Sequence, residues 1–159
     1  MKVISLNTWS GRAGKKELLD FFDRNREVDV FCLHEIWSGG EHDVHQWGGD
    51  SVDTQLLTNI QNTLTDHISF FRPFYCDWYG QALFIKKGIK ILEEGDIFVF
   101  KNREDAFDTV QKTVSNHARN LQYVTLETKD GPKTILNLHG LWNGGGKTDA
   151  PERLIQSDN

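Results

Sequence analysis

Up to residue 35, the chain alternates between nearly continuous apolar runs and one stretch with helical spacing. Residues 2–9 (KVISLNTW) and 28–35 (VDVFCLHE) are apolar and partly β-branched, which is typical of strands buried on both faces. Between them, residues 16–26 place their apolar side chains on one face and predict an amphipathic helix that covers a sheet. Strand, helix and strand in this order favour a layered α/β (α+β) domain.

The middle of the chain predicts a long loop, a second helix and a series of strands. Residues 37–53 are rich in glycine, acids and tryptophan, which is typical of a surface loop. Residues 54–66 carry leucine and isoleucine at helical spacing and predict a second covering helix. Strand-like segments follow at 69–75, 81–88, 89–95 and 96–100, joined by short turns.

A β-hairpin is predicted further along, where strand-like residues 120–128 and 133–142 flank a short polar segment. That segment contains Asp130-Gly131, and both residues tolerate the positive φ that a tight hairpin turn requires. We therefore expect the turn to be centred on this pair.

The end of the chain resembles the start of a helix, with Pro151 in its first turn. A domain rarely stops within a helix that covers its own sheet. We therefore expect residues 1–159 to be the N-terminal part of one longer domain.

Charge and composition narrow the classes of protein. The net charge is -5 with acids and bases interleaved, so a tight nucleic-acid binder is disfavoured, although an enzyme that meets nucleic acid briefly is not. Cys32 and Cys76 lack C-x-x-C spacing and are expected to be buried free thiols. The apolar start is too short for a signal peptide or a membrane span, so we expect a cytoplasmic protein. We also expect a monomer.

Polar residues end three of the predicted strands, namely Asn7, Glu35 and His139. Ligand sites of α/β sheets tend to lie at the carboxyl ends of strands, so these side chains could meet at one site. Amide and carboxylate oxygens suit Mg²⁺. The alternative is that Asn7 forms a turn, Glu35 is a solvated loop acid and His139 is structural.

An ordered series of motifs covers nearly the whole chain: VISLNTW, VDVFCLHEIW, GQALFIKK, Arg119 before LQYVTLE, ILNLHG and Arg153-x-x-Gln156. In order and approximate spacing, this series resembles the opening motifs of the endonuclease/exonuclease/phosphatase superfamily. The resemblance implies a DNase I-like fold, a two-layer β-sandwich flanked by helices. It also implies hydrolysis of phosphodiesters or phosphomonoesters by in-line attack of water.

The same resemblance assigns roles to four residues. Glu35 matches the glutamate that binds Mg²⁺, with Mn²⁺ as an alternative metal, and Asn7 matches an asparagine that positions metal or phosphate. His139 matches the histidine that contacts the scissile phosphate. Arg119 matches an arginine on a strand near the catalytic site. The substrate class stays open among nucleic acids, lipid headgroups, nucleotides and small phosphoesters.

Two motifs of the superfamily are missing from the sequence. Neither Gly-Asp-x-Asn nor Ser-Asp-His occurs, and in the family these supply the residues that activate the water. Loss of a general base typically lowers the rate by a factor of about a hundred to ten thousand. We therefore expect the 159 residues alone to be nearly inactive.

Two other functions compete with hydrolysis. The first is a non-catalytic binding module that uses exposed tryptophans Trp37 and Trp47 of the loop 37–53 to stack on a ligand. The second is a zinc site formed by His34, His42 and His45, although this spacing matches no zinc pattern well. The aromatic stretch 70–79 could line a substrate edge, but sheet core is the preferred interpretation.

Overall fold

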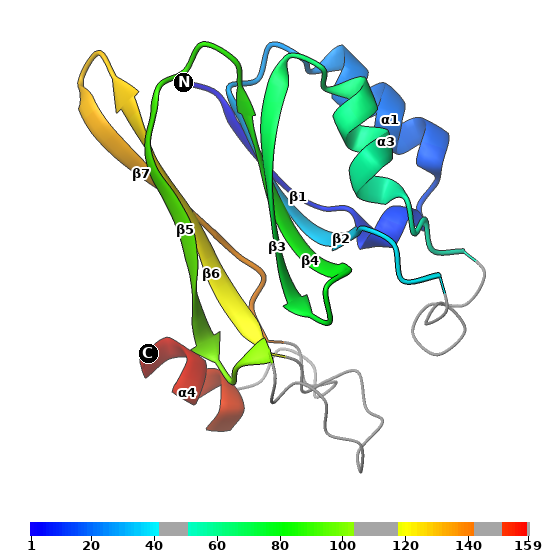
Figure 1. Ribbon diagram of the computed structural model, residues 1–159, viewed down its shortest axis with the longest axis vertical. Helices are drawn as coiled ribbons and strands as arrows, with labels where there is room; N and C mark the ends of the chain where they lie inside the picture. Colours follow the sequence, from blue (N-terminus) through cyan, green and yellow to red (C-terminus); the bar gives the residue numbers. More distant parts are fainter. Residues whose placement is uncertain (42–50, 104–117, 142–150, 159) are drawn as a thin grey trace.

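The computed structural model describes residues 1–41, 51–103, 118–141 and 151–158. Two β-sheets lie face to face, and two helices pack on the outer side of the first sheet (Figure 1). This is the mixed, two-sheet architecture that the family resemblance implied. The elements are β1 (Val3–Asn7), η1 (Trp9–Gly11), α1 (Lys15–Arg24), β2 (Val30–Trp37), α3 (Leu56–Thr63), β3 (His67–Tyr75), β4 (Tyr79–Lys86), β5 (Ile91–Phe100), β6 (Arg119–Thr128), β7 (Gly131–Leu138) and α4 (Pro151–Asp158).

The first sheet has the strand order β1-β2-β4-β3. β1 is parallel to β2, and the other pairs are antiparallel. Helices α1 and α3 bury their apolar sides on this sheet, and Phe22 of α1 packs edge-on against Phe31 of β2. The predicted helices are both present, although each is shorter than predicted.

The second sheet is antiparallel with the order β5-β6-β7. Its inner face packs on the first sheet through a cluster of buried apolar side chains: Val30, Cys32, Leu83, Ile85, Val124 and Leu126. Burial raises the pKa of the Cys32 thiol to about 11, so it is an inert core residue. Cys32 is therefore the buried free thiol that was predicted, whereas Cys76 is only partly buried.

Strand β5 corrects one prediction. Residues 89–95 and 96–100 were expected to be two strands, but Ile91–Phe100 is one continuous strand. The short turn expected between them would fall at Gly95. In the sheet it lies opposite Tyr123, where an added Cβ would come within 2.9 Å of the Tyr123 hydroxyl. The glycine therefore makes room for a side chain of the neighbouring strand and does not end β5.

The β6–β7 hairpin is confirmed, but its turn is displaced by one residue. Thr128 pairs with Gly131, so Lys129 and Asp130 are the two central residues of the turn. Gly131 has a φ of 99°, while Asp130 does not take a positive φ. Glycine is thus needed directly after the turn, where the chain enters β7.

The aromatic stretch 70–79 is mainly core, as the preferred interpretation held. Phe74, Tyr75 and Trp78 are buried together with Trp37. Trp37 is only 2% exposed, stacks on Trp78 at 4.3 Å between ring centroids and donates a hydrogen bond to Ser10 Oγ. The prediction of Trp37 as an exposed ligand-binding tryptophan is therefore wrong, and Trp47 lies outside the described residues.

At the end of the chain, α4 begins at Pro151, as predicted. Leu141, which follows the second sheet, donates its backbone N–H to Gln156 Oε1 of this helix over 3.1 Å. None of the helices in the described ranges has the length and apolar character needed to cross a membrane.

Candidate active site

Asn7 and Glu35 meet where β1 and β2 end side by side. Asn7 is the last residue of β1 and pairs with His34 in the parallel ladder. Its side-chain Nδ2 donates a hydrogen bond to Glu35 Oε1 over 2.9 Å. Its Oδ1 accepts the backbone N–H of Trp9 over 2.8 Å, which fixes the orientation of the amide. The amide and the carboxylate predicted from the two strand ends are therefore in contact.

A β-bulge in β2 sets the direction of the Glu35 side chain. Leu33 pairs with Ala82 and Ile36 with Gly80, so β2 contains one residue more than β4 across this interval. Glu35 accordingly has a φ of 58°, which is uncommon for a residue other than glycine. The buried Thr8 hydroxyl lies within hydrogen-bond distance of the carbonyl oxygens of His34 and Glu35, at 2.8 and 3.1 Å. Thr8 thereby stabilises the strained backbone that presents Glu35.

His139 reaches the same place from the second sheet. It follows directly after β7, and its Nε2 lies 3.7 Å from Glu35 Oε1. Its ring stacks on the His34 ring with 5.2 Å between centroids and an interplanar angle of 12°. The structure therefore brings Asn7, Glu35 and His139 together, two from the first sheet and one from the second.

The His139 imidazole is neutral at physiological pH. Burial, with smaller contributions from the positive charge of Arg119 and from the neighbouring His34, lowers its pKa to about 3. The approach of His139 to Glu35 is consequently not an ion pair, and 3.7 Å is too long for a hydrogen bond. A neutral imidazole carries one N–H donor and one acceptor nitrogen, so His139 can donate a hydrogen bond to a phosphate oxygen.

Arg119 is buried beside these residues. Its Nε donates to the Gly140 carbonyl over 3.3 Å, and another guanidinium nitrogen donates to the Ala118 carbonyl over 3.1 Å. The guanidinium carbon lies 4.8 Å from the centre of the Phe74 ring. Arg119 thus holds the backbone directly after His139 and contributes positive charge to the site.

His34 is a site residue that the hydrolase interpretation missed. It was considered only as a zinc ligand with His42 and His45, which both lie outside the described residues. His34 follows Val30 and Cys32 at two-residue spacing on β2, so its side chain lies on the same inward-facing side of the strand. This spacing was the available signal that His34 points into the interior. Burial lowers the pKa of His34. In the described part of the chain, His34 Nε2 and His139 Nδ1 are buried without a hydrogen-bond partner.

The oxygen atoms of the site are compatible with Mg²⁺. Glu35 Oε2 has no hydrogen-bond partner among the described residues, and Asn7 Oδ1 keeps a second lone pair beside its bond from Trp9. Mg²⁺ retains several waters and needs only one or two protein carboxylates. Within residues 1–41, 51–103, 118–141 and 151–158, no group of three or more His, Cys, Asp or Glu side chains could hold a metal. The oxygen donors described at this site therefore fit a largely hydrated ion.

Comparison with known proteins gave matches among solved structures. No protein-family model and no curated protein matches the chain. An endonuclease/exonuclease/phosphatase family protein from Leptotrichia buccalis matches with a TM-score of 0.64 and 16% identity over 97% of this chain and 59% of its own. A mannosyl-6-phosphatase from Bacteroides thetaiotaomicron matches with a TM-score of 0.62 and 16% identity, over 98% of this chain and 55% of its own.

A humanized TDP2 from D. rerio also matches, with a TM-score of 0.57 and 15% identity over 88% of this chain and 47% of its own. At these identities the likeness concerns the fold. The chain therefore has the DNase I-like fold of endonuclease/exonuclease/phosphatase family proteins, and it spans about half the length of the solved structures that it matches.

Proposed function

We propose that this chain carries the metal- and phosphate-binding side of a Mg²⁺-dependent phosphoester hydrolase, with Mn²⁺ as an alternative metal. The observation that supports it is the convergence of Asn7, Glu35 and His139 from two different sheets. An amide, a carboxylate and an imidazole at adjoining strand ends form the donor set that such an enzyme requires. The fold shared with phosphoesterases supports the same proposal.

Each residue has a distinct part in this proposal. Glu35 holds the ion through its carboxylate, and Asn7 orients that carboxylate through the 2.9 Å hydrogen bond from its Nδ2. When bound, Mg²⁺ supplies positive charge that stabilises the negative charge developing on the phosphoryl oxygens. The neutral His139 imidazole donates an N–H to one of these oxygens. The positive charge of Arg119 adds to the attraction for the phosphate.

Turnover needs groups that the 159 residues do not supply. The sequence contains neither Gly-Asp-x-Asn nor Ser-Asp-His, the motifs that the family resemblance links to activation of the attacking water. We therefore propose that the chain alone binds phosphoesters with Mg²⁺ but hydrolyses them at a negligible rate. A polypeptide that carries the two motifs would complete the site.

Dimethyl phosphate, a stable phosphodiester, tests this proposal. In an NMR titration with Mg²⁺ present, we expect chemical-shift changes at Asn7, Glu35 and His139. We expect binding to weaken about tenfold or more in His139→Ala, because a hydrogen bond to a charged group contributes about 1.5–3 kcal/mol. Without Mg²⁺ the shifts should largely disappear.

A parallel assay uses bis(p-nitrophenyl) phosphate to measure turnover. Release of nitrophenol by the chain should not exceed that of Mg²⁺ alone. If dimethyl phosphate binds equally well to His139→Ala and to the unaltered chain, the proposed phosphate site is wrong. Rapid Mg²⁺-dependent hydrolysis would instead contradict the assignment of water activation to the two missing motifs.

A further inference from the structure

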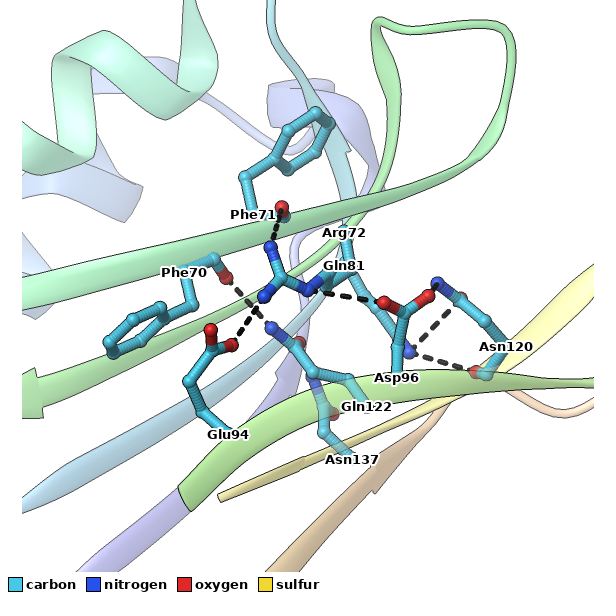
Figure 2. A network of polar contacts seen from close by, with 9 residues as sticks. All are labelled: Phe70, Phe71, Arg72, Gln81, Glu94, Asp96, Asn120, Gln122 and Asn137. Carbon is cyan, nitrogen blue, oxygen red and sulfur yellow. Dashed lines mark hydrogen bonds and ion pairs between the residues drawn. The ribbon is translucent and has the colours of Figure 1, made fainter. Parts of the chain in front are cut away.

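A belt of polar side chains crosses the interior between the two sheets (Figure 2). Its members are Arg72, Gln81, Glu94, Asp96, Asn120, Gln122 and Asn137. The four amides are buried, in a region where the alternation of the strands otherwise directs apolar side chains inward. Buried amides are destabilising unless they are hydrogen-bonded, so the partners of each one identify its role.

One branch of the belt has a fixed direction. The Asp96 carboxylate accepts hydrogen bonds only, so Asn120 turns its Nδ2 toward Asp96, at 2.8 Å. Asn120 Oδ1 therefore faces the opposite way and accepts from Gln81 Nε2 at 3.2 Å, while the Asn120 backbone carbonyl accepts from the same nitrogen at 2.8 Å. Arg72 Nε, 3.2 Å from Asp96 Oδ1, balances the charge at the start of the branch.

The other end of this branch is at the candidate active site. Because Gln81 Nε2 is directed to Asn120, its Oε1 points toward β7, where it accepts the backbone N–H of His139 over 3.3 Å. His139 lies directly beyond the last ladder pair of β7, Leu121 with Leu138. Gln81 itself is on β4, next to the strand that carries Glu35. It therefore links the two halves of the site.

We propose that Gln81 is a positioning residue that fixes His139 opposite Glu35 across the gap between the sheets. The chain of bonds from Asp96 through Asn120 sets the orientation of the Gln81 amide, and this amide sets the position of the His139 backbone. The hydrogen bonds in such a chain strengthen one another in the low-dielectric interior. The role of Gln81 in placing His139 does not depend on the proposed function. The consequence of this placement for phosphate binding does rest on the proposed function.

The second branch of the belt provides a matched control. Gln122 is as fully buried as Gln81, and its Nε2 donates to the Phe70 carbonyl over 2.8 Å. Its Oε1 accepts from Asn137 Nδ2 over 3.2 Å, so it also joins neighbouring strands across the interior. Gln122 makes no hydrogen bond to His139 in the described residues. A role limited to holding the sheets together would make Gln81 and Gln122 equivalent.

The experiment compares Gln81→Met with Gln122→Met. Methionine has a similar volume and flexibility but no comparable hydrogen-bonding groups, so packing is largely retained. In Gln81→Met we expect the His139 amide proton to exchange with solvent about tenfold faster, because the hydrogen bond that protects it is lost. The ring resonances of His34 and His139, which are sensitive to their stacking, should shift. In Gln122→Met the exchange of the His139 amide proton should stay close to that of the unaltered chain.

The outcomes separate this inference from the proposed function. Unchanged His139 exchange in Gln81→Met, or an equal change in both variants, would overturn the positioning role of Gln81. Should Gln81→Met not fold, the unaltered chain decides, because a rapidly exchanging His139 amide contradicts the bond to Gln81.

Affinity for dimethyl phosphate with Mg²⁺ is the second readout, and it should fall in Gln81→Met but not in Gln122→Met. If the unaltered chain does not bind dimethyl phosphate at all, the proposed function fails. The exchange data still decide the role of Gln81 in that case.

Discussion

Replacing Glu35 with glutamine is expected to weaken the binding of Mn²⁺, used as a probe for Mg²⁺, by at least about a hundredfold, or about 2.8 kcal/mol. Among the described residues, Glu35 is the only acid in contact with Asn7 and His139, so we expect its carboxylate to provide the negative charge for the proposed ion. Glutamine has the same shape and can still accept the Asn7 hydrogen bond. The change thus removes charge and leaves the local packing intact. Isothermal titration calorimetry measures the affinity directly.

Glu127→Gln is the matched control for this change. Glu127 lies near the hairpin end of β6 and forms an exposed ion pair with Lys90. Its loss should leave Mn²⁺ affinity unchanged and alter stability by less than about 1 kcal/mol. Equal Mn²⁺ affinities for Glu35→Gln and Glu127→Gln would show that Glu35 does not hold the metal.

Truncation of Phe31 to alanine is expected to lower the free energy of unfolding by about 3–5 kcal/mol. Phe31 is fully buried on β2, between the first sheet and its helices. Its ring packs edge-on against Phe22, with 5.4 Å between centroids, and lies 5.5 Å from the ring of His67. Removing it opens a cavity among the buried side chains of this cluster. Urea denaturation followed by circular dichroism measures the loss.

Ile97→Ala provides the comparison for Phe31→Ala. Ile97 is 52% exposed on β5, so its truncation removes little buried surface and should change the unfolding free energy by less than about 1 kcal/mol. Similar losses in the two variants would mean that the cluster around Phe31 is not the main core of the first sheet.

Hydrophobic periodicity was sufficient to predict the elements around the site. Residues 2–9 and 28–35 were expected to be strands buried on both faces, and both strands are present. Only β2 is largely buried, whereas β1 lies at the edge of its sheet and has no buried residue, so that part of the prediction is wrong for β1. The polar residue at the end of each strand, Asn7 and Glu35, followed from the same pattern. Local patterns of this kind indicate which residues face a core, but they do not indicate which other strands or helices these residues pack against.

The exact geometry of the site depends on pairings that a local pattern does not contain. Glu35 points toward Asn7 because β2 bulges against β4, a strand more than 40 residues further along the chain. His34 joins the site only because β7 of the second sheet brings His139 against its ring. Both features arise from tertiary contacts between distant segments.

The polar belt left a signal that was not used. Asn120 and Gln122 alternate with outward-facing residues and continue into the buried Val124 and Leu126 on the inner side of β6. Amides at inward positions of a strand require buried partners, so they indicate an interior network. The alignment of the two sheets decides which partners these amides find. It also decides that Gln81 reaches His139.

Line broadening by Mn²⁺ in the NMR spectrum of the unaltered chain tests whether Asn7, Glu35 and His139 surround one ion. A paramagnetic ion broadens the resonances of nearby nuclei most strongly. We expect substoichiometric Mn²⁺ to broaden the signals of these three residues first and together, and an excess of Mg²⁺ to restore them. Broadening centred on other residues, or broadening of Glu35 while His139 stays sharp, would contradict a shared metal site.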